Sequence, residues 1–200
     1  MNGRLGWFWK ESLDRLDRYL ASVQEKEETM SETKTMTTDE STFVFSRTFD
    51  APRDLVWKSW TEADRLMQWW GPKGFTMKVA RLDLRPEGTF HYCLESPEGH
   101  EMWGKFVYKV IEKPSRLDFV VSFSDAEGGT TRHPMSEEWP LEVYGTMTLT
   151  ERNGRTTIDS KSWPINAAPN EVAAFIKGHR SMEAGYNGTL DQLAEYLARP

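Results

Sequence analysis

The chain has 200 residues, of which 38% are apolar and 28% are charged, and its formal net charge is −6. These proportions are ordinary for a globular domain with a hydrophobic core. An acidic chain without a cluster of Lys and Arg lacks the basic face that nucleic-acid binding requires, and no apolar run approaches the roughly 20 residues of a membrane-spanning helix. We therefore expect no nucleic-acid partner and no membrane partner.

The cysteine content bears on the cellular compartment, and the aromatic content bears on the core. Cys93 is the single cysteine, so it cannot form an internal disulfide, which fits a reducing cytosol. The apolar run at 5–9 is too short for the core of a signal peptide, and acidic residues follow it at once. We therefore expect a cytoplasmic protein. Its nine Trp and ten Phe residues either fill a bulky core or line a large apolar pocket.

The first 35 residues are predicted to form a helical extension and linker, 1–35, ahead of one domain at 36–200. Residues 24–41 are rich in Glu, Thr, Ser and Lys, a composition typical of a linker. The apolar stripe of the extension either recruits a partner protein or a second copy of the chain, forming a homodimer, or docks on its own domain. A translation start at Met30 or Met36 is a further alternative, in which the extension is not made. The stripe has helical spacing and consists of Trp9, Leu13, Leu16, Leu20 and Val23.

The domain is predicted to open with one strand and two short helices. Residues 43–49 alternate between Phe and smaller residues, the period of a half-buried strand. Residues 52–60 are expected to form a first helix, which a proline opens. Thr61, followed by Asp64, resembles a capping box for a second helix, and the glycine and proline at 71–72 end that helix.

Six further strands are predicted between residues 75 and 163. The last two are joined by Asn153-Gly154, the strongest short hairpin signal. The segment 125–140 is long, charged and contains Gly and Pro, which is typical of a functional lid or a disordered loop. Alternating residues bounded by turn signals place the six strands at 75–84, 89–95, 101–111, 117–124, 142–151 and 155–163.

One long helix is predicted from about Pro169 to Ala198. Gly178, Gly185 and Gly188 lie inside this helix, and each costs about 1 kcal/mol relative to alanine. They either permit close approach of the sheet or leave room beside the helix, and we expect Gly185 to border a ligand cavity. The stripe that should face the core consists of Val172, Phe175, Ile176, His179, Met182, Tyr186, Leu190, Leu193 and Leu197.

Several short motifs, taken in order, are similar to those of one protein family. Over about residues 43–198 the chain resembles the START-like (SRPBCC) helix-grip family, in the branch related to the activator of heat-shock-protein-90 ATPase. The motifs are Ala51-Pro52 with Val56-Trp57, Trp69-Trp70-Gly71-Pro72, Asp83-Leu84-Arg85-Pro86-Glu87-Gly88, Gly178-His179-Arg180-Ser181-Met182 with Gly185, and Thr189-Leu190-Asp191-Gln192-Leu193.

This resemblance implies an α+β fold. A curved seven-stranded antiparallel sheet would wrap around a long C-terminal helix, with two short helices after strand one. The resemblance also implies a cavity between the sheet and that helix, often used for an apolar or aromatic small molecule. It does not imply one activity, because this fold hosts several functions.

Residues that carry chemistry are few and scattered. His133 with Glu137 and Glu138 is the one local group of metal-binding side chains, and its spacing does not match a structural zinc site, so we predict no metal and no cofactor. Cys93 lies in a predicted strand, a setting more typical of an inert buried thiol than of a nucleophile. No catalytic residue is assigned, because the sequence does not show that any two acid–base candidates converge. Those candidates are His91, His179, Asp83 and Tyr186.

We predict that the domain binds an apolar or aromatic small molecule in the cavity between the sheet and the C-terminal helix. Two alternatives stay open: a cavity-based enzyme of the cyclase or hydrolase type, and a co-chaperone-like regulator of a heat-shock-protein-90 ATPase. Strand alternation and helix spacing select the lining as Trp70, Phe90, Tyr92, Phe119, Val121, Met147, Phe175, His179, Met182 and Tyr186.

Overall fold

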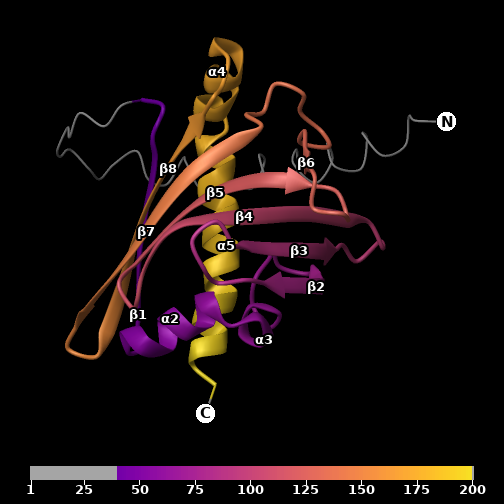
Figure 1. Cartoon of the computed structure of the whole chain (residues 1–200). Coiled ribbons are helices and arrows are strands. Elements are labelled where there is room, and N and C mark those ends of the chain that lie inside the picture. The colour runs from indigo at the N-terminus through magenta and orange to yellow at the C-terminus, as the bar shows by residue number, and fades with distance from the viewer. Residues whose placement is uncertain (1–39, 200) are drawn as a thin grey trace, which may run out of the picture. The chain divides into compact units, whose positions relative to one another are not determined.

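A curved antiparallel sheet lies against a long C-terminal helix in the computed structural model, which describes residues 40–199 (Figure 1). The strands are β1 (Phe43–Phe49), β2 (Thr76–Leu82), β3 (Thr89–Glu95), β4 (Glu101–Glu112), β5 (Arg116–Ser124), β6 (Thr130–Thr131), β7 (Glu142–Arg152) and β8 (Arg155–Ile165). The helices are α2 (Arg53–Thr61), α3 (Ala63–Leu66), α4 (Pro169–Lys177) and α5 (His179–Leu197). This order confirms the predicted α+β helix-grip fold, with the two-residue β6 as an addition. The predicted stripe and alternative start sites, and the predicted linker as far as residue 39, lie outside the described residues.

The strands follow the order β1-β8-β7-β5-β4-β3-β2 across the sheet, and β6 pairs with β5. Every pair is antiparallel, and the first strand lies beside the last. In the β7–β8 hairpin, Asn153 and Gly154 have φ angles of 54° and 75° between the paired residues Arg152 and Arg155. Two successive positive φ angles are the geometry of a tight type I′ turn, so the predicted hairpin is confirmed.

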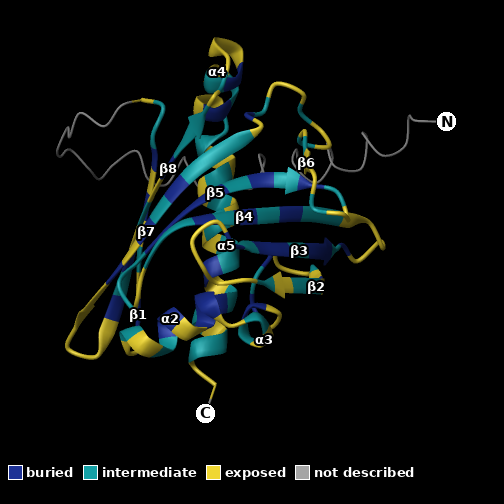
Figure 2. Cartoon of the chain, viewed as in Figure 1, coloured by how far each residue is buried: buried dark blue, intermediate teal, exposed yellow. Residues whose placement is uncertain are grey.

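The sheet buries one apolar face because alternate residues of a strand point to the same side. Figure 2 shows that exposed residues gather at the turns, at the tip of the β7–β8 hairpin and on α4. The C-terminal half of α5 adds the buried side chains that oppose the sheet. The buried set includes Leu117 and Phe119 of β5, Met147 and Leu149 of β7, and Leu190 and Leu193 of α5.

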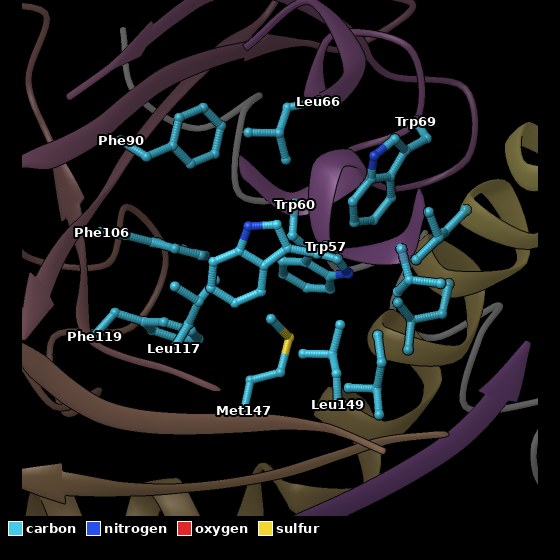
Figure 3. Packing of buried hydrophobic residues seen from close by; sticks show 14 of the residues in the cluster. Trp57, Trp60, Leu66, Trp69, Phe90, Phe106, Leu117, Phe119, Met147 and Leu149 are labelled. Carbon is cyan, nitrogen blue, oxygen red and sulfur yellow. The ribbon is translucent and has the colours of Figure 1, made fainter. Parts of the chain in front are cut away.

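Tryptophans from the region of the first two helices fill one end of the core. Trp57 and Trp60 of α2 and Trp69, which follows α3, are all buried. The Trp60 and Trp69 rings meet edge to face at a centroid distance of 5.0 Å, a favoured aromatic geometry. The indole N–H of Trp69 donates to the carbonyl of Ser59 at 3.0 Å. Figure 3 shows Trp60 in the middle of this buried cluster.

The start of α3 differs from the prediction. The helix follows Glu62, and no side chain caps its first turn. The hydroxyl of Thr61 instead donates to the carbonyl of Trp57 at 2.8 Å, inside α2. Threonine commonly bonds back to the carbonyl four residues earlier when it lies within a helix. The predicted capping box is therefore wrong, because α2 extends one residue further and includes Thr61.

The C-terminal helix is interrupted at Gly178, where the sequence predicts one continuous helix. Gly178 separates α4 from α5 while it keeps right-handed dihedrals, φ −79° and ψ −9°. A Cβ at Gly178 would lie 2.6 Å from the Trp139 ring, so this ring takes the place of a side chain. At Gly185 and Gly188, no heavy atom lies within 4 Å of where a Cβ would be, and Gly185 is exposed. The prediction that Gly185 borders a ligand cavity is therefore wrong.

Candidate ligand cavity

A cavity of about 210 Å³ lies between the sheet and the C-terminal helices. Its walls come from β3, β4, β5, β7, β8, α4 and α5, together with the loop that precedes β7. A dry cavity of about 150 Å³ is enough to hold a benzene ring, so this cavity accommodates a somewhat larger molecule. The lining consists of Tyr92, Met102, Trp103, Gly104, Phe119, Val121, Ser122, Phe123, Trp139, Pro140, Val143, Gly145, Ser160, Ser162, Phe175, Met182 and Tyr186.

Two glycines in the cavity wall admit aromatic rings from the neighbouring strands. Gly104 on β4 pairs with Tyr92 on β3, and Gly145 on β7 pairs with Phe119 on β5. A Cβ at Gly104 would lie 2.5 Å from the Tyr92 hydroxyl oxygen, and one at Gly145 would lie 2.6 Å from the Phe119 ring. Each ring therefore lies across the backbone of its cross-strand partner. The sheet has a smooth apolar wall here only because both partners lack a side chain.

Tyr92 is held on several sides by other aromatic rings. It stacks on Phe90 at 5.0 Å and meets Trp70 and Phe106 edge to face at 6.0 and 6.1 Å. Burial raises the pKa of the Tyr92 phenol far above its ordinary value, and the nearby Trp70 indole N–H offsets part of this rise. The hydroxyl therefore stays protonated throughout the physiological pH range.

The helix side of the cavity is formed by α4 and α5. Tyr186 packs against the rings of Phe43 and of Phe45, each at 5.7 Å, and burial raises the pKa of its phenol. Phe175 is fully buried and stands edge to face with His179 at 5.1 Å. Burial lowers the pKa of His179, so its imidazole is neutral at pH 7. Among the described residues, the Nε2 atom of His179 is buried and has no hydrogen-bond partner.

The β6–β7 loop, residues 132–141, contributes Trp139 and Pro140 to the cavity wall. Trp139 contacts Phe175 at 5.5 Å, and the Arg132 guanidinium donates to the Trp139 carbonyl at 3.2 Å. Arg132 also forms an ion pair with Glu171 of α4, which lowers the pKa of that carboxyl, and the backbone N–H of Ala168 lowers it further. The loop is therefore joined to α4 next to the cavity.

His133 and Cys93, the metal-binding and thiol candidates, both have their side chains packed among neighbouring residues of the domain. The Nδ1 atom of His133 accepts a hydrogen bond from the Met135 backbone N–H at 3.0 Å, and its ring contacts Phe123 at 4.5 Å. Burial lowers the pKa of His133. Within residues 40–199, no three His, Cys, Asp or Glu side chains gather around one point. Cys93 is fully buried, and this burial, with Glu101 and Glu95 nearby, raises its thiol pKa to about 11.

The acid–base candidates do not converge in the structure. His91 stacks on Trp103 at 5.0 Å, and its Nε2 atom lies 3.0 Å from the Asp125 carbonyl oxygen. Asp83 pairs with Arg85 at an exposed turn. Of His91, Asp83, His179 and Tyr186, only Tyr186 lines the cavity.

The predicted lining residues occupy three surroundings. Trp70 and Met147 line a neighbouring space of about 10 Å³, which shares Phe119, Ser160 and Tyr186 with the main cavity. Phe90 is 1% exposed and belongs to the core beside Tyr92, whereas His179 packs between Phe43 and Phe175. The predicted residues that do line the main cavity are Tyr92, Phe119, Val121, Phe175, Met182 and Tyr186. Their role in binding stays a prediction.

Sequence reasoning missed Met102 and Trp103 on β4, Phe123 on β5 and Val143 on β7, as well as the small and the loop-borne lining residues. Ser160 and Ser162 continue the inward alternation of Ile158 on β8, so the strand period offered a signal for them. Trp139 and Pro140 offered a weaker signal, an apolar pair at the end of a charged segment. The two wall glycines become visible only once the strand register is known.

Comparison with known proteins identifies the family. The family model described as "Activator of Hsp90 ATPase homolog 1-like protein" matches residues 50–198. The chain belongs to this family. No curated protein matches the chain.

Solved structures share the fold of this Activator of Hsp90 ATPase homolog 1-like chain. A crystal structure from Mycobacterium smegmatis is 21% identical with a TM-score of 0.65, covering 85% of this chain and 98% of its own. Solution structures from Arthrobacter aurescens and Staphylococcus epidermidis are 23% and 24% identical, with TM-scores of 0.67 and 0.65. The first covers 84% of this chain and 94% of its own, and the second covers 82% and 93%. In the part of the chain that the structure describes, no helix is both long and apolar enough to cross a membrane.

Proposed function

We propose that the domain binds a small, uncharged apolar or aromatic molecule in the cavity between the sheet and helices α4 and α5. The observation that carries this proposal is the lining, which is mostly aromatic and aliphatic and has no side chain that is charged at neutral pH. Moving an unpaired charge from water into such a site is strongly unfavourable, whereas buried apolar surface contributes about 25 cal/mol per Å². The cavity therefore favours a neutral ligand over an anion or a cation.

The size of the cavity supports a ligand of one or two rings. Its volume of about 210 Å³ lies below the range of roughly 300–1,000 Å³ that is typical of sites for drug-sized molecules. Four hydroxyl-bearing residues, Tyr92, Tyr186, Ser160 and Ser162, belong to the lining. A few polar groups on an apolar wall are typical of sites that orient a neutral molecule.

The lining supports binding rather than catalysis. A cyclase or hydrolase uses a general acid or base whose pKa lies near the working pH. The cavity formed by residues 40–199 has no carboxylate, imidazole or amine in its lining, and burial raises the pKa of both lining tyrosines. The co-chaperone-like alternative rests on the family description. Stimulation of an Hsp90 ATPase by the purified chain would support that alternative.

Calorimetric titration with indane, a neutral bicyclic hydrocarbon, tests the proposal. Met182 lies on α5 and lines the cavity, so the indole of Met182→Trp should occupy the free volume. The adjacent Glu183 is exposed, and Glu183→Trp adds the same side chain to the outer face of the same helix. We expect indane to bind the wild type and Glu183→Trp equally, and Met182→Trp at least about tenfold more weakly, which corresponds to 1.4 kcal/mol or more.

Two results would contradict the proposal. One is a folded wild type that does not bind indane, and the other is a Met182→Trp variant that binds it with unchanged affinity. If indane binds as expected, native mass spectrometry of the protein purified from its own host would detect the natural ligand, as a mass shift that disappears on denaturation.

A further inference from the structure

We infer that the Tyr92 hydroxyl donates a hydrogen bond to the bound molecule, so that the ligand is a neutral aromatic carrying an acceptor such as a carbonyl oxygen. This inference rests on the proposed function, because it gives an orientation to the molecule in the cavity. Tyr92 lies near the middle of β3, and its side chain is part of the cavity wall.

The groups around the hydroxyl indicate the direction in which it can form a hydrogen bond. The Trp70 ring meets the Tyr92 ring edge to face at 6.0 Å and lowers the pKa of its phenol, and an indole N–H can only donate. Trp70 therefore offers no acceptor, and the Tyr92 O–H stays available for another group. Within residues 40–199, no carbonyl or side-chain oxygen accepts a hydrogen bond from this hydroxyl. An acceptor on the ligand would complete the pairing.

The surroundings of the Tyr92 ring fix where the O–H is presented. Phe90, Phe106 and Trp70 contact the ring at 5.0, 6.1 and 6.0 Å, and the backbone of Gly104 lies beneath it. A Cβ at Gly104 would lie 2.5 Å from the hydroxyl oxygen, so glycine at this position makes room for the polar end of the ring. A donor held by its neighbours in this way recognises an acceptor without first being ordered.

A matched pair of probes isolates this hydrogen bond. Indane and 1-indanone share one bicyclic skeleton, and only the second has a carbonyl. We expect Tyr92→Phe to reduce the ratio of 1-indanone to indane affinity by about two- to tenfold, the range for a neutral hydrogen bond, whatever its effect on the binding of indane itself. Comparing ratios removes the difference in hydration between the two probes. Both titrations use the full chain.

A second tyrosine provides the control. Tyr144 lies outside the cavity, where its hydroxyl donates to Asp118 at 3.3 Å and its ring stacks on Trp163 at 5.1 Å. Tyr144→Phe should therefore keep the wild-type ratio. An infrared spectrum of 1-indanone bound to the wild type provides a readout that needs no variant. Its carbonyl stretch should lie below the frequency measured in an alkane solvent, because a hydrogen bond weakens the C=O bond.

The outcomes separate this inference from the proposed function. If indane binds but Tyr92→Phe keeps the wild-type ratio, or if the bound carbonyl stretch is unshifted, the inference is wrong and the proposed function stands. If the ratio falls in Tyr186→Phe instead, the donor lies on α5 and the assignment to Tyr92 is overturned. If neither probe binds the wild type, the proposed function itself fails.

Discussion

The two ends of α5 pack against the same sheet in different ways. Toward the C-terminus, Leu190 and Leu193 are 1% and 0% exposed and belong to the buried cluster that includes Trp60. Toward the N-terminus, Met182 and Tyr186 are only partly buried and line the cavity. One helix therefore has a filled end and an open end, and the sheet beneath explains the difference.

Side chains on the inner face of the β7–β8 hairpin become smaller from the filled end to the open end. At the filled end, large aliphatic residues oppose the helix and meet the rings brought by α2. At the open end, glycine and serine take the same inward positions, the Phe119 ring lies across Gly145, and Ser160 and Ser162 border the cavity. The cavity is thus a property of the strand sequence rather than of a displaced helix. The paired residues, in order, are Leu149 with Ile158, Met147 with Ser160, and Gly145 with Ser162.

The largest expected effect on stability comes from truncating a large apolar side chain to alanine at each end of α5. Leu193→Ala removes a fully buried side chain from a filled environment, which should lower the free energy of unfolding by about 2–5 kcal/mol. Met182→Ala removes a partly buried side chain beside free volume, so its loss should be less than half as large. Urea denaturation with comparable slopes for all variants measures both values. Equal losses would mean that the two ends are equally well packed.

The fold was predictable because each element carries its own periodic signal. Phe119 and Val121 alternate along β5, and Asn153-Gly154 specifies its hairpin without help from distant residues. The cavity depends on contacts between distant residues. Alternation places Phe90 and Tyr92 on one face of β3, yet only Tyr92 lines the cavity, while Phe90 is buried beside Trp70.

The loop side of the cavity depends on similar long-range contacts. Trp139 reaches the cavity from a loop that Arg132 joins to Glu171, 39 residues further along the chain. Local patterns contain no signal for such a contact. Gly185 was predicted to border the cavity but is exposed to solvent. Helical spacing alone does not show which residues beside the buried stripe of α5 face solvent.

The glycines of the open end should respond to alanine in opposite directions. Gly185 is an exposed helical residue with free space beside it, so Gly185→Ala should raise the free energy of unfolding by up to about 1 kcal/mol through helix propensity. Gly178→Ala would place its Cβ 2.6 Å from the Trp139 ring, so it should lower stability by displacing that ring. Thermal and urea melts of both variants test this. A stabilising Gly178→Ala would show that Trp139 moves away easily.

The smallest expected effect concerns the ion pair that joins the β6–β7 loop to α4. Arg132 lowers the pKa of Glu171 below its ordinary value of 4.5 in the folded protein. A depressed folded pKa means that the pair stabilises the protein fully above pH 4.5, and that this stabilisation is lost as the pH falls through the lower, folded pKa. Because Arg132 is half exposed, the stabilisation should be small even at neutral pH.

We therefore expect Arg132→Met to be slightly less stable than the wild type at neutral pH, and the difference to shrink steadily in acid. Urea melts of both proteins across this pH range measure it. A difference that stays constant into acid would mean that the hydrogen bond from Arg132 to the Trp139 carbonyl, rather than the ion pair with Glu171, joins the loop to the rest of the domain.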